Sequence, residues 1–181
     1  MEDKPEVIAV ELVPHRPEWA DMAKAEGARL KAALGDLVIT VHHVGSTAIP
    51  SILAKPIVDL CPIVRDLAAL DAQEKTVRGL GYRWLGEFGL AGRRYCTFTD
   101  PVTGKRKFQL HCYRDGDESL TRHLAFRDYL RAHPLIAKAY EMEKIRAAAL
   151  QPNNTIDYNA EKNDWIKRTE KDALAWYEKQ R

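Results

Sequence analysis

The sequence predicts an α+β fold made by one domain, and three observations lead to this prediction. Its 181 residues, 45% of them hydrophobic, suffice for one compact core and are few for two domains. Strand-like runs rich in β-branched residues lie within about residues 7–113. From about residue 117 to 179 the apolar spacing becomes helical, with proline-containing breaks. We therefore expect a sheet followed by a helical C-terminal part.

The first 44 residues predict a strand, a helix and a second strand. Residues 7–13 alternate apolar and polar side chains, which is typical of an edge strand, and Pro14 ends the run. Helical spacing then begins at Pro17 and stops at Gly35, which predicts a helix of about five turns. Residues 37–44 form a continuous apolar run with many β-branched residues, so we expect a buried central strand there.

A turn made by Gly45, Ser46 and Thr47 breaks this strand. Ser46 or Thr47 can cap a short helix running toward Leu53, which would leave backbone N–H groups and a hydroxyl facing outward. Such an arrangement binds phosphate. A plain capped turn between a strand and a helix fits the spacing equally well, because a lone Gly-Ser pair is a weak signal.

Asp59 lies at the centre of the next predicted strand, residues 57–64. With a period of two, Ile57, Asp59, Cys61 and Ile63 share one face of that strand. A carboxylate isolated in an apolar run costs several kcal/mol unless it is paired, hydrogen-bonded or bound to a metal. Asp59 therefore needs a partner close to the Gly-Ser turn.

The middle of the chain predicts a helix, a strand and a glycine-rich loop. The helix begins at Asp66 and ends at Gly79 or Gly81, and a strand follows at residues 82–85. Residues 86–92 contain three glycines at three-residue spacing, which resembles a nucleotide-binding loop. We favour a flexible connection between strands, because no strong helix start follows the glycines.

A hairpin is expected next, with arms at residues 93–99 and 105–113 around the turn at residues 100–104. The second arm presents His111 at mid-strand, in the same way as Asp59 is presented on its strand. A histidine in such a position is more often a satisfied structural group than a ligand. An acid on a neighbouring strand favours a functional role.

The C-terminal part is expected to form three helices, at about residues 120–131, 135–150 and 155–179. His123 and Arg127 lie one turn apart on one face of the first of these helices. Lys162 lies one turn after Tyr158 on the last. Each of these polar residues is a candidate for a ligand contact, although most charges of this kind belong to solvated helix surface.

The composition excludes some classes of protein. With 28 basic and 26 acidic residues the net charge is +2, which lacks the signature of a nucleic-acid or membrane protein. Residues 1–5 have no apolar segment, so we expect a cytoplasmic protein without a membrane span. The three cysteines lack metal-binding spacing and are expected to be small core residues with free thiols: Cys61, Cys96 and Cys112.

Several motifs in combination resemble the GrpB family over nearly the whole chain. They are Val44–Pro50, Ala54–Leu60, Gly81–Tyr82, Gly92–Tyr95, Leu110–His111 and Arg122–Leu130. That family is regarded as a branch of the nucleotidyltransferase fold superfamily. The resemblance implies a nucleotidyltransferase-like mixed β-sheet flanked by helices, with the Gly45–Ser46 turn near a triphosphate and strand carboxylates holding Mg²⁺.

The resemblance also assigns places to the acids of the expected metal site. In the superfamily the first strand after Gly-Ser usually carries two acids two residues apart, and a later strand supplies a third. Here Ile57 occupies the first place, Asp59 the second, and His111 the place of the third. The resemblance thus implies an NTP as substrate and Mg²⁺ held by Asp59 and His111.

Two functions follow as expectations. The first is transfer of a nucleotide from an NTP to a small-molecule acceptor, with Asp59, His111 and Lys55 as the catalytic residues. The expected phosphate-binding or substrate-binding residues are Gly45, Ser46, Thr47, Arg93, Arg94, His123, Arg127 and Lys162.

The second function is a non-catalytic module that binds a nucleotide or another anion, or that serves a protein partner, on a degenerate transferase fold. Its support is the family's likeness to a domain fused to dephospho-CoA kinase. RNA binding is disfavoured by the near-neutral charge. Ser-His-Asp hydrolysis is disfavoured because Ser46 lacks a Gly-x-Ser-x-Gly elbow.

Overall fold

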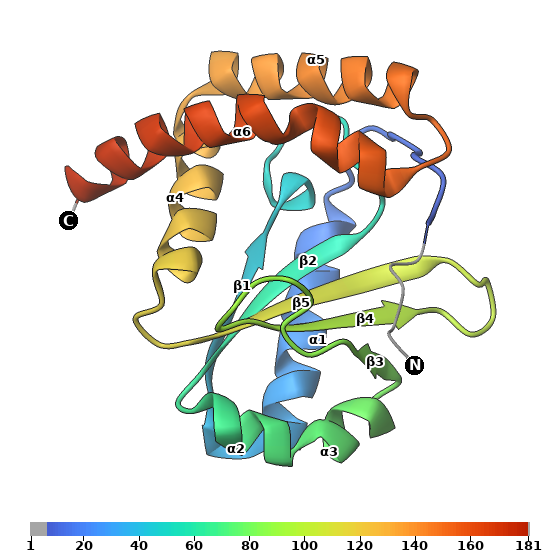
Figure 1. The fold of residues 1–181 in the computed structure, drawn as a ribbon, viewed down its shortest axis with the longest axis vertical. Helices are drawn as coiled ribbons and strands as arrows, with labels where there is room; N and C mark the ends of the chain where they lie inside the picture. The colour runs from blue at the N-terminus through green and yellow to red at the C-terminus, as the bar shows by residue number, and fades with distance from the viewer. Residues whose placement is uncertain (1–6, 181) are drawn as a thin grey trace.

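The structure, a computed structural model, describes residues 7–180 (Figure 1). Residues 1–5, for which the sequence predicts no targeting segment, lie outside this range. The strands are β1 (Val38–Val44), β2 (Val58–Val64), β3 (Tyr82–Trp84), β4 (Arg94–Thr99) and β5 (Arg106–Arg114). The α-helices are α1 (Glu18–Leu34), α2 (Leu67–Ala72), α3 (Glu74–Gly79), α4 (Glu118–Ala132), α5 (Pro134–Leu150) and α6 (Thr155–Glu178). Two short 3-10 turns, η1 (Gly35–Leu37) and η2 (Ser46–Ala48), flank β1.

The strands form one five-stranded sheet in the order β1-β2-β5-β4-β3. β2 and β5 run parallel at its centre, while β1 with β2, β4 with β5 and β3 with β4 are antiparallel. The sheet is therefore mixed, as the family resemblance implies. The parallel pairing places Asp59 of β2 opposite Gln109 of β5.

The two faces of the sheet have different coverings (Figure 1). One face packs on α1, α2 and α3 through a large apolar cluster that includes Trp19, Leu60 and Leu110. On the other face, Cys61 and Tyr113 belong to a smaller cluster. Because side chains alternate along a strand, Asp59 and His111 project on this second face, toward the C-terminal helices.

The C-terminal part is helical as predicted, and α4, α5 and α6 contact one another above the sheet (Figure 1). A third apolar cluster joins these helices to the segment after the Gly-Ser turn through Ile49, Ile52, Leu130 and Tyr140. This cluster fixes α5 and α6 relative to the end of β1. The helices can therefore present side chains to the same space as Asp59.

Two predicted strands differ from the observed ones. Residues 7–13 do not join the sheet, because their backbone groups bond elsewhere: Val10 N–H donates to the carbonyl of Pro152, and Val13 forms an isolated bridge with Ala54. The strand predicted to be central, β1, lies at an edge of the sheet. Its apolar content reflects packing against α1 and α4 rather than strands on both sides.

Two predicted helices also differ. The helix expected from Asp66 to about residue 80 is two short helices, α2 and α3, which meet at Gln73. Asp66 caps the first of them by accepting a hydrogen bond from Ala69 N–H at 2.7 Å. The helix expected to run from the Gly-Ser turn toward Leu53 is only the short turn η2, without a side-chain cap.

The cysteine prediction agrees with the structure, since Cys61, Cys96 and Cys112 are buried free thiols in the two sheet clusters. Burial raises the pKa of the Cys61 thiol, which keeps it protonated. Among the helices within residues 7–180, none has the length and apolar character needed to cross a membrane.

Candidate functional site

The Gly-Ser turn is tied to Asp59 through the backbone of Gly45. Val44 pairs with Asp59 across β1 and β2, and Gly45 follows with a φ of 71°. A Cβ atom at position 45 would lie 2.7 Å from Asp59 Oδ2. Both the backbone conformation and the close carboxylate therefore require glycine.

The two hydroxyls of the turn have different surroundings. Thr47 Oγ1 lies 2.8 Å from Nε2 of His43, and the Thr47 side chain is buried. Burial lowers the pKa of His43 to about 4, so this imidazole is neutral at pH 7. Ser46 Oγ lies 3.5 Å from the hydroxyl of Tyr140 on α5. Ser46, not Thr47, thus offers the more available hydroxyl.

Asp59, a carboxylate in an apolar strand, is paired with His111. Its Oδ1 lies 3.2 Å from Nε2 of His111, and both side chains are partly exposed. The two residues come from the parallel strands β2 and β5, with Gln109 directly opposite Asp59. The sequence identified Asp59 and His111, and the structure brings them together.

A cavity of about 150 Å³ lies between the Gly-Ser turn, Asp59 and the C-terminal helices. Three lysines line it: Lys55 from the segment before β2, Lys144 from α5 and Lys162 from α6. The other lining residues are Gly45, Ser46, Thr47, Ile57, Asp59, Gln109, Tyr140, Tyr158 and Asn159. We call this space the lysine cavity.

The lysines of this cavity are unusually desolvated. Lys144 is 1% exposed and Lys162 is 7% exposed. Burial lowers the pKa of each to about 7, and burial also lowers the pKa of Lys55 while the Asp59 carboxylate opposes that change. Ammonium groups gathered in this way favour an anionic ligand, because an anion restores the interactions that burial removes.

Local contacts hold the three lysine side chains in place. The Nζ atoms of Lys162 and Lys55 lie 4.0 Å and 5.2 Å from the ring centre of Tyr158, at cation–π distance. Lys144 donates to the carbonyl of Leu53, and its Nζ lies 4.8 Å from the ring centre of Tyr140. The aromatic rings thus order the amines beside the cavity.

A second cavity, of about 260 Å³, adjoins the lysine cavity on the side of His111. It is lined by His111, His123 and residues of α4 and α6, and it shares Gly45, Asp59, Gln109 and Tyr140 with the lysine cavity. Burial lowers the pKa of His123 well below its usual range, so its imidazole is neutral. We call this space the histidine cavity. Asp59 lies where the two cavities meet.

The donor set at Asp59 does not fit a resident Mg²⁺ site. Mg²⁺ prefers an octahedron of oxygen ligands, usually with at least one or two carboxylates. Within residues 7–180 no three His, Cys, Asp or Glu side chains gather where they could hold a metal ion. Ile57, which lies just before β2 and two residues before Asp59, is apolar and lines the cavity.

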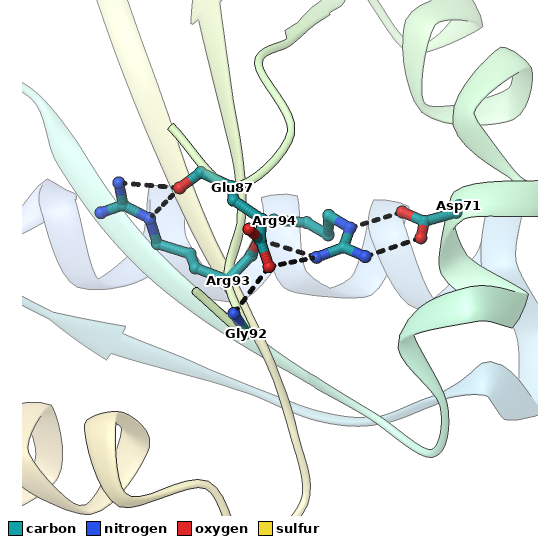
Figure 2. Close-up of polar contacts among 5 residues, drawn as sticks. All are labelled: Asp71, Glu87, Gly92, Arg93 and Arg94. Carbon is teal, nitrogen blue, oxygen red and sulfur yellow. Dashed lines mark hydrogen bonds and ion pairs between the residues drawn. The ribbon is translucent and has the colours of Figure 1, made fainter. Parts of the chain in front are cut away.

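The structure does not bring Arg93 and Arg94 to the lysine cavity. Figure 2 shows their guanidinium groups pointing in opposite directions. Arg94 forms a two-point ion pair with Asp71, at 2.5 and 2.7 Å, and Arg93 donates to the carbonyls of Glu87 and Phe88. Arg93 is thus bound to carbonyls of the glycine-rich loop, while Arg94 is paired with Asp71 of α2 and lies 3.6 Å from Glu87 of the loop.

Arg127 also makes contacts that stabilise the fold and lies outside both cavities. It donates to the carbonyl of His43 at 3.1 Å and pairs with Asp128 at 2.7 Å, which ties α4 to β1. It lines neither the lysine cavity nor the histidine cavity.

Sequence reasoning missed Lys144, Tyr140 and Gln109 as site residues. A signal for Lys144 exists, because Tyr140, Lys144 and Ala147 follow one another at helical spacing and all three are buried. Burying a lysine on the apolar face of a helix costs free energy, so a lysine in this pattern is a candidate for a functional residue. Gln109 shares the strand face of His111 and lines both cavities.

The family model described as GrpB protein matches residues 9–172 of this chain. The chain belongs to the GrpB family. It is 41% identical to the UPF0157 protein YqkA of Bacillus subtilis over 167 residues, which cover 92% of this GrpB-family chain and 48% of YqkA. The chain thus spans about half the length of that relative.

Solved structures agree with the family assignment and with the fold. The crystal structure of the conserved protein GrpB from Enterococcus faecalis has a TM-score of 0.85 and 37% identity, covering 92% of this chain and 99% of that one. The Cid1 poly(U) polymerase with MgGTP bound has a TM-score of 0.52 at 13% identity, covering 76% of this chain and 44% of that one. This second likeness shows that the GrpB-family chain has a nucleotidyltransferase-like fold.

Proposed function

We propose that this protein binds a nucleotide through its phosphate groups in the lysine cavity. The observation that carries the proposal is the convergence of Lys55, Lys144 and Lys162 on one space beside the Gly-Ser turn. Phosphate oxygens accept hydrogen bonds from ammonium groups and neutralise their charge.

Two further features support a nucleotide rather than inorganic phosphate. The lysine cavity shares four lining residues with the histidine cavity, so the part of a ligand beyond its phosphates has adjoining space beside Asp59. The fold likeness includes Cid1 structures with MgGTP and with Mg 3'-dATP bound. In this chain the phosphates would lie against the three lysines and Ser46.

The test is calorimetric titration of the purified protein with ATP and with inorganic triphosphate. We expect binding of both, and we expect Lys162→Met to weaken it by about 30-fold or more, which corresponds to roughly 2 kcal/mol. Lys167→Met is the matched control, because Lys167 is an exposed lysine on the same helix. Absence of heat with every nucleotide and with triphosphate would rule the proposal out.

A second candidate function is transfer of the nucleotide to a small-molecule acceptor. The Asp59–His111 pair favours it, because this pair lies where the two cavities meet and can take a proton from an acceptor hydroxyl beside the phosphates. In this reaction an acceptor hydroxyl would form an O–P bond to the α-phosphorus. The bond from that phosphorus to the leaving pyrophosphate would break, and the pair would take the hydroxyl proton.

Asp59→Asn separates binding from transfer. Asp59 contributes a negative charge beside the expected phosphates, so its removal is expected to leave ATP binding intact or tighten it by a few-fold. Transfer of label from α-labelled ATP to acceptors in a small-molecule extract is expected to fall by at least about 100-fold, since the proton acceptor is lost. If the wild-type protein transfers no label with any extract, the binding function alone stands. If Asp59→Asn abolishes ATP binding with its fold intact, the placement of the phosphates is wrong.

A further inference from the structure

The acids nearest the lysine cavity are already neutralised by other cations. Glu141, one turn before Lys144, accepts from Lys138 and from Leu53 N–H. Glu143 pairs with Arg146 at 2.6 Å. Asp59 is the carboxylate among the residues that line the cavity. Three lysine amines and one carboxylate therefore line the cavity, so protonation of all three amines leaves a positive surplus for an anionic ligand to balance.

The same cavity is unfavourable for divalent cations. A pair of Mg²⁺ ions needs several anionic oxygens to offset four positive charges. Here Ile57, 8% exposed, lines the cavity just before β2 and two residues before Asp59, and the neutral Gln109 lies opposite Asp59. Lysine ammonium groups on the other walls add repulsion. The charge that metals supply in a phosphate site is present here as lysine side chains.

We infer that the lysine cluster replaces divalent cations, so that this site takes a metal-free polyphosphate, such as a nucleoside triphosphate without Mg²⁺. This inference rests on the proposed phosphate-binding function and states the form of the ligand. Lys55, Lys144 and Lys162 bind the phosphate oxygens directly. Ile57 keeps the cavity wall apolar where a second carboxylate would recruit a metal ion and repel the bare phosphates.

The experiment compares ATP titrations of the wild-type protein in EDTA and in excess Mg²⁺. We expect binding in EDTA with an affinity equal to or greater than that in Mg²⁺. Binding that requires Mg²⁺, with a loss of about tenfold or more in EDTA, would overturn the inference and leave the phosphate-binding proposal standing. Absence of binding in both buffers would instead refute the phosphate-binding proposal itself.

A substitution at position 57 provides a second readout. Ile57→Asp restores a second carboxylate two residues before Asp59, so ATP binding in EDTA is expected to fall by about tenfold and to recover with Mg²⁺. Ile57→Asn is the matched control, with a similar size and no charge, and it is expected to show no response to Mg²⁺. Thermal unfolding of both variants verifies that they fold. Equal responses of the folded Asp and Asn variants to Mg²⁺ would contradict the role assigned to Ile57.

Discussion

Lys162→Met is expected to stabilise the ligand-free protein while it weakens phosphate binding. The Lys162 side chain is 7% exposed, and burial lowers its pKa from the ordinary 10.5 to about 7. Between about pH 7 and 10.5 the unfolded chain therefore binds more protons at this residue than the folded chain does. Stability that depends on this lysine rises with pH across that window.

Methionine has a volume close to that of lysine and carries no amine, so the substitution removes the free-energy cost of burying the amine. We expect the free energy of unfolding at pH 7 to increase by about 1–2 kcal/mol, or a Tm rise of roughly 3–6 °C. The increase in stability should shrink from pH 7 toward pH 10, because the free-energy cost of deprotonating Lys162 on folding falls as the pH approaches its ordinary pKa of 10.5. Thermal unfolding at pH 7 and pH 10 measures both effects.

Lys167→Met controls for the removal of one positive charge from α6. Because Lys167 is exposed, its replacement should change stability by less than about 0.5 kcal/mol at either pH. If Lys162→Met lowers stability at pH 7 and leaves ATP binding unchanged, then Lys162 is a structural lysine. The lysine cavity would then lose its main support as a ligand site.

Gly45→Ala is expected to damage both the fold and the site. The glycine has φ 71° and ψ −171°, a region that side chains with a Cβ rarely occupy, and the added Cβ would lie 2.7 Å from Asp59 Oδ2. The alanine must therefore strain the backbone and displace the carboxylate. We expect a loss of about 2–4 kcal/mol of stability, measured by urea denaturation.

Gly35→Ala is the matched control for Gly45→Ala, because it strains the backbone without bringing a Cβ close to a carboxylate. Gly35 has a similar backbone, φ 58° and ψ −140°, but nothing lies within 4 Å of the Cβ that alanine would add. Its replacement should lose only the backbone contribution, about 1–2 kcal/mol. Equal losses at Gly35 and Gly45 would show that contact with Asp59 plays no part.

The sequence alone predicted the strand faces and helix ends that are set by residues close together in the chain. The two-residue period placed Asp59 and His111 on matching strand faces, and the proline-containing breaks separated the three C-terminal helices. The edge position of β1 could not be read in this way. Strand order depends on which strands pair, and β-branched residues favour a central and an edge strand alike.

The site was predicted less completely than the fold, for a physical reason. Lys162 was a candidate, but Lys144 belongs to the site only because the packing of α5 brings it to the same cavity as Asp59. Arg94 was predicted to neutralise phosphate charge, yet its guanidinium pairs with Asp71, which lies 23 residues earlier. The pairing of distant charges is decided by tertiary packing, which a motif does not specify.

The pKa values of the cavity lysines provide the most direct test of the account. The side-chain carbons of Lys55, Lys144 and Lys162, assigned by single substitutions, are followed by NMR across pH in EDTA, with and without inorganic triphosphate. We predict that Lys144 and Lys162 titrate near 7 in the free protein, and that triphosphate raises the pKa of both by more than about one unit. Titration of both near 10.5, with no response to triphosphate, would contradict a phosphate-binding lysine cavity.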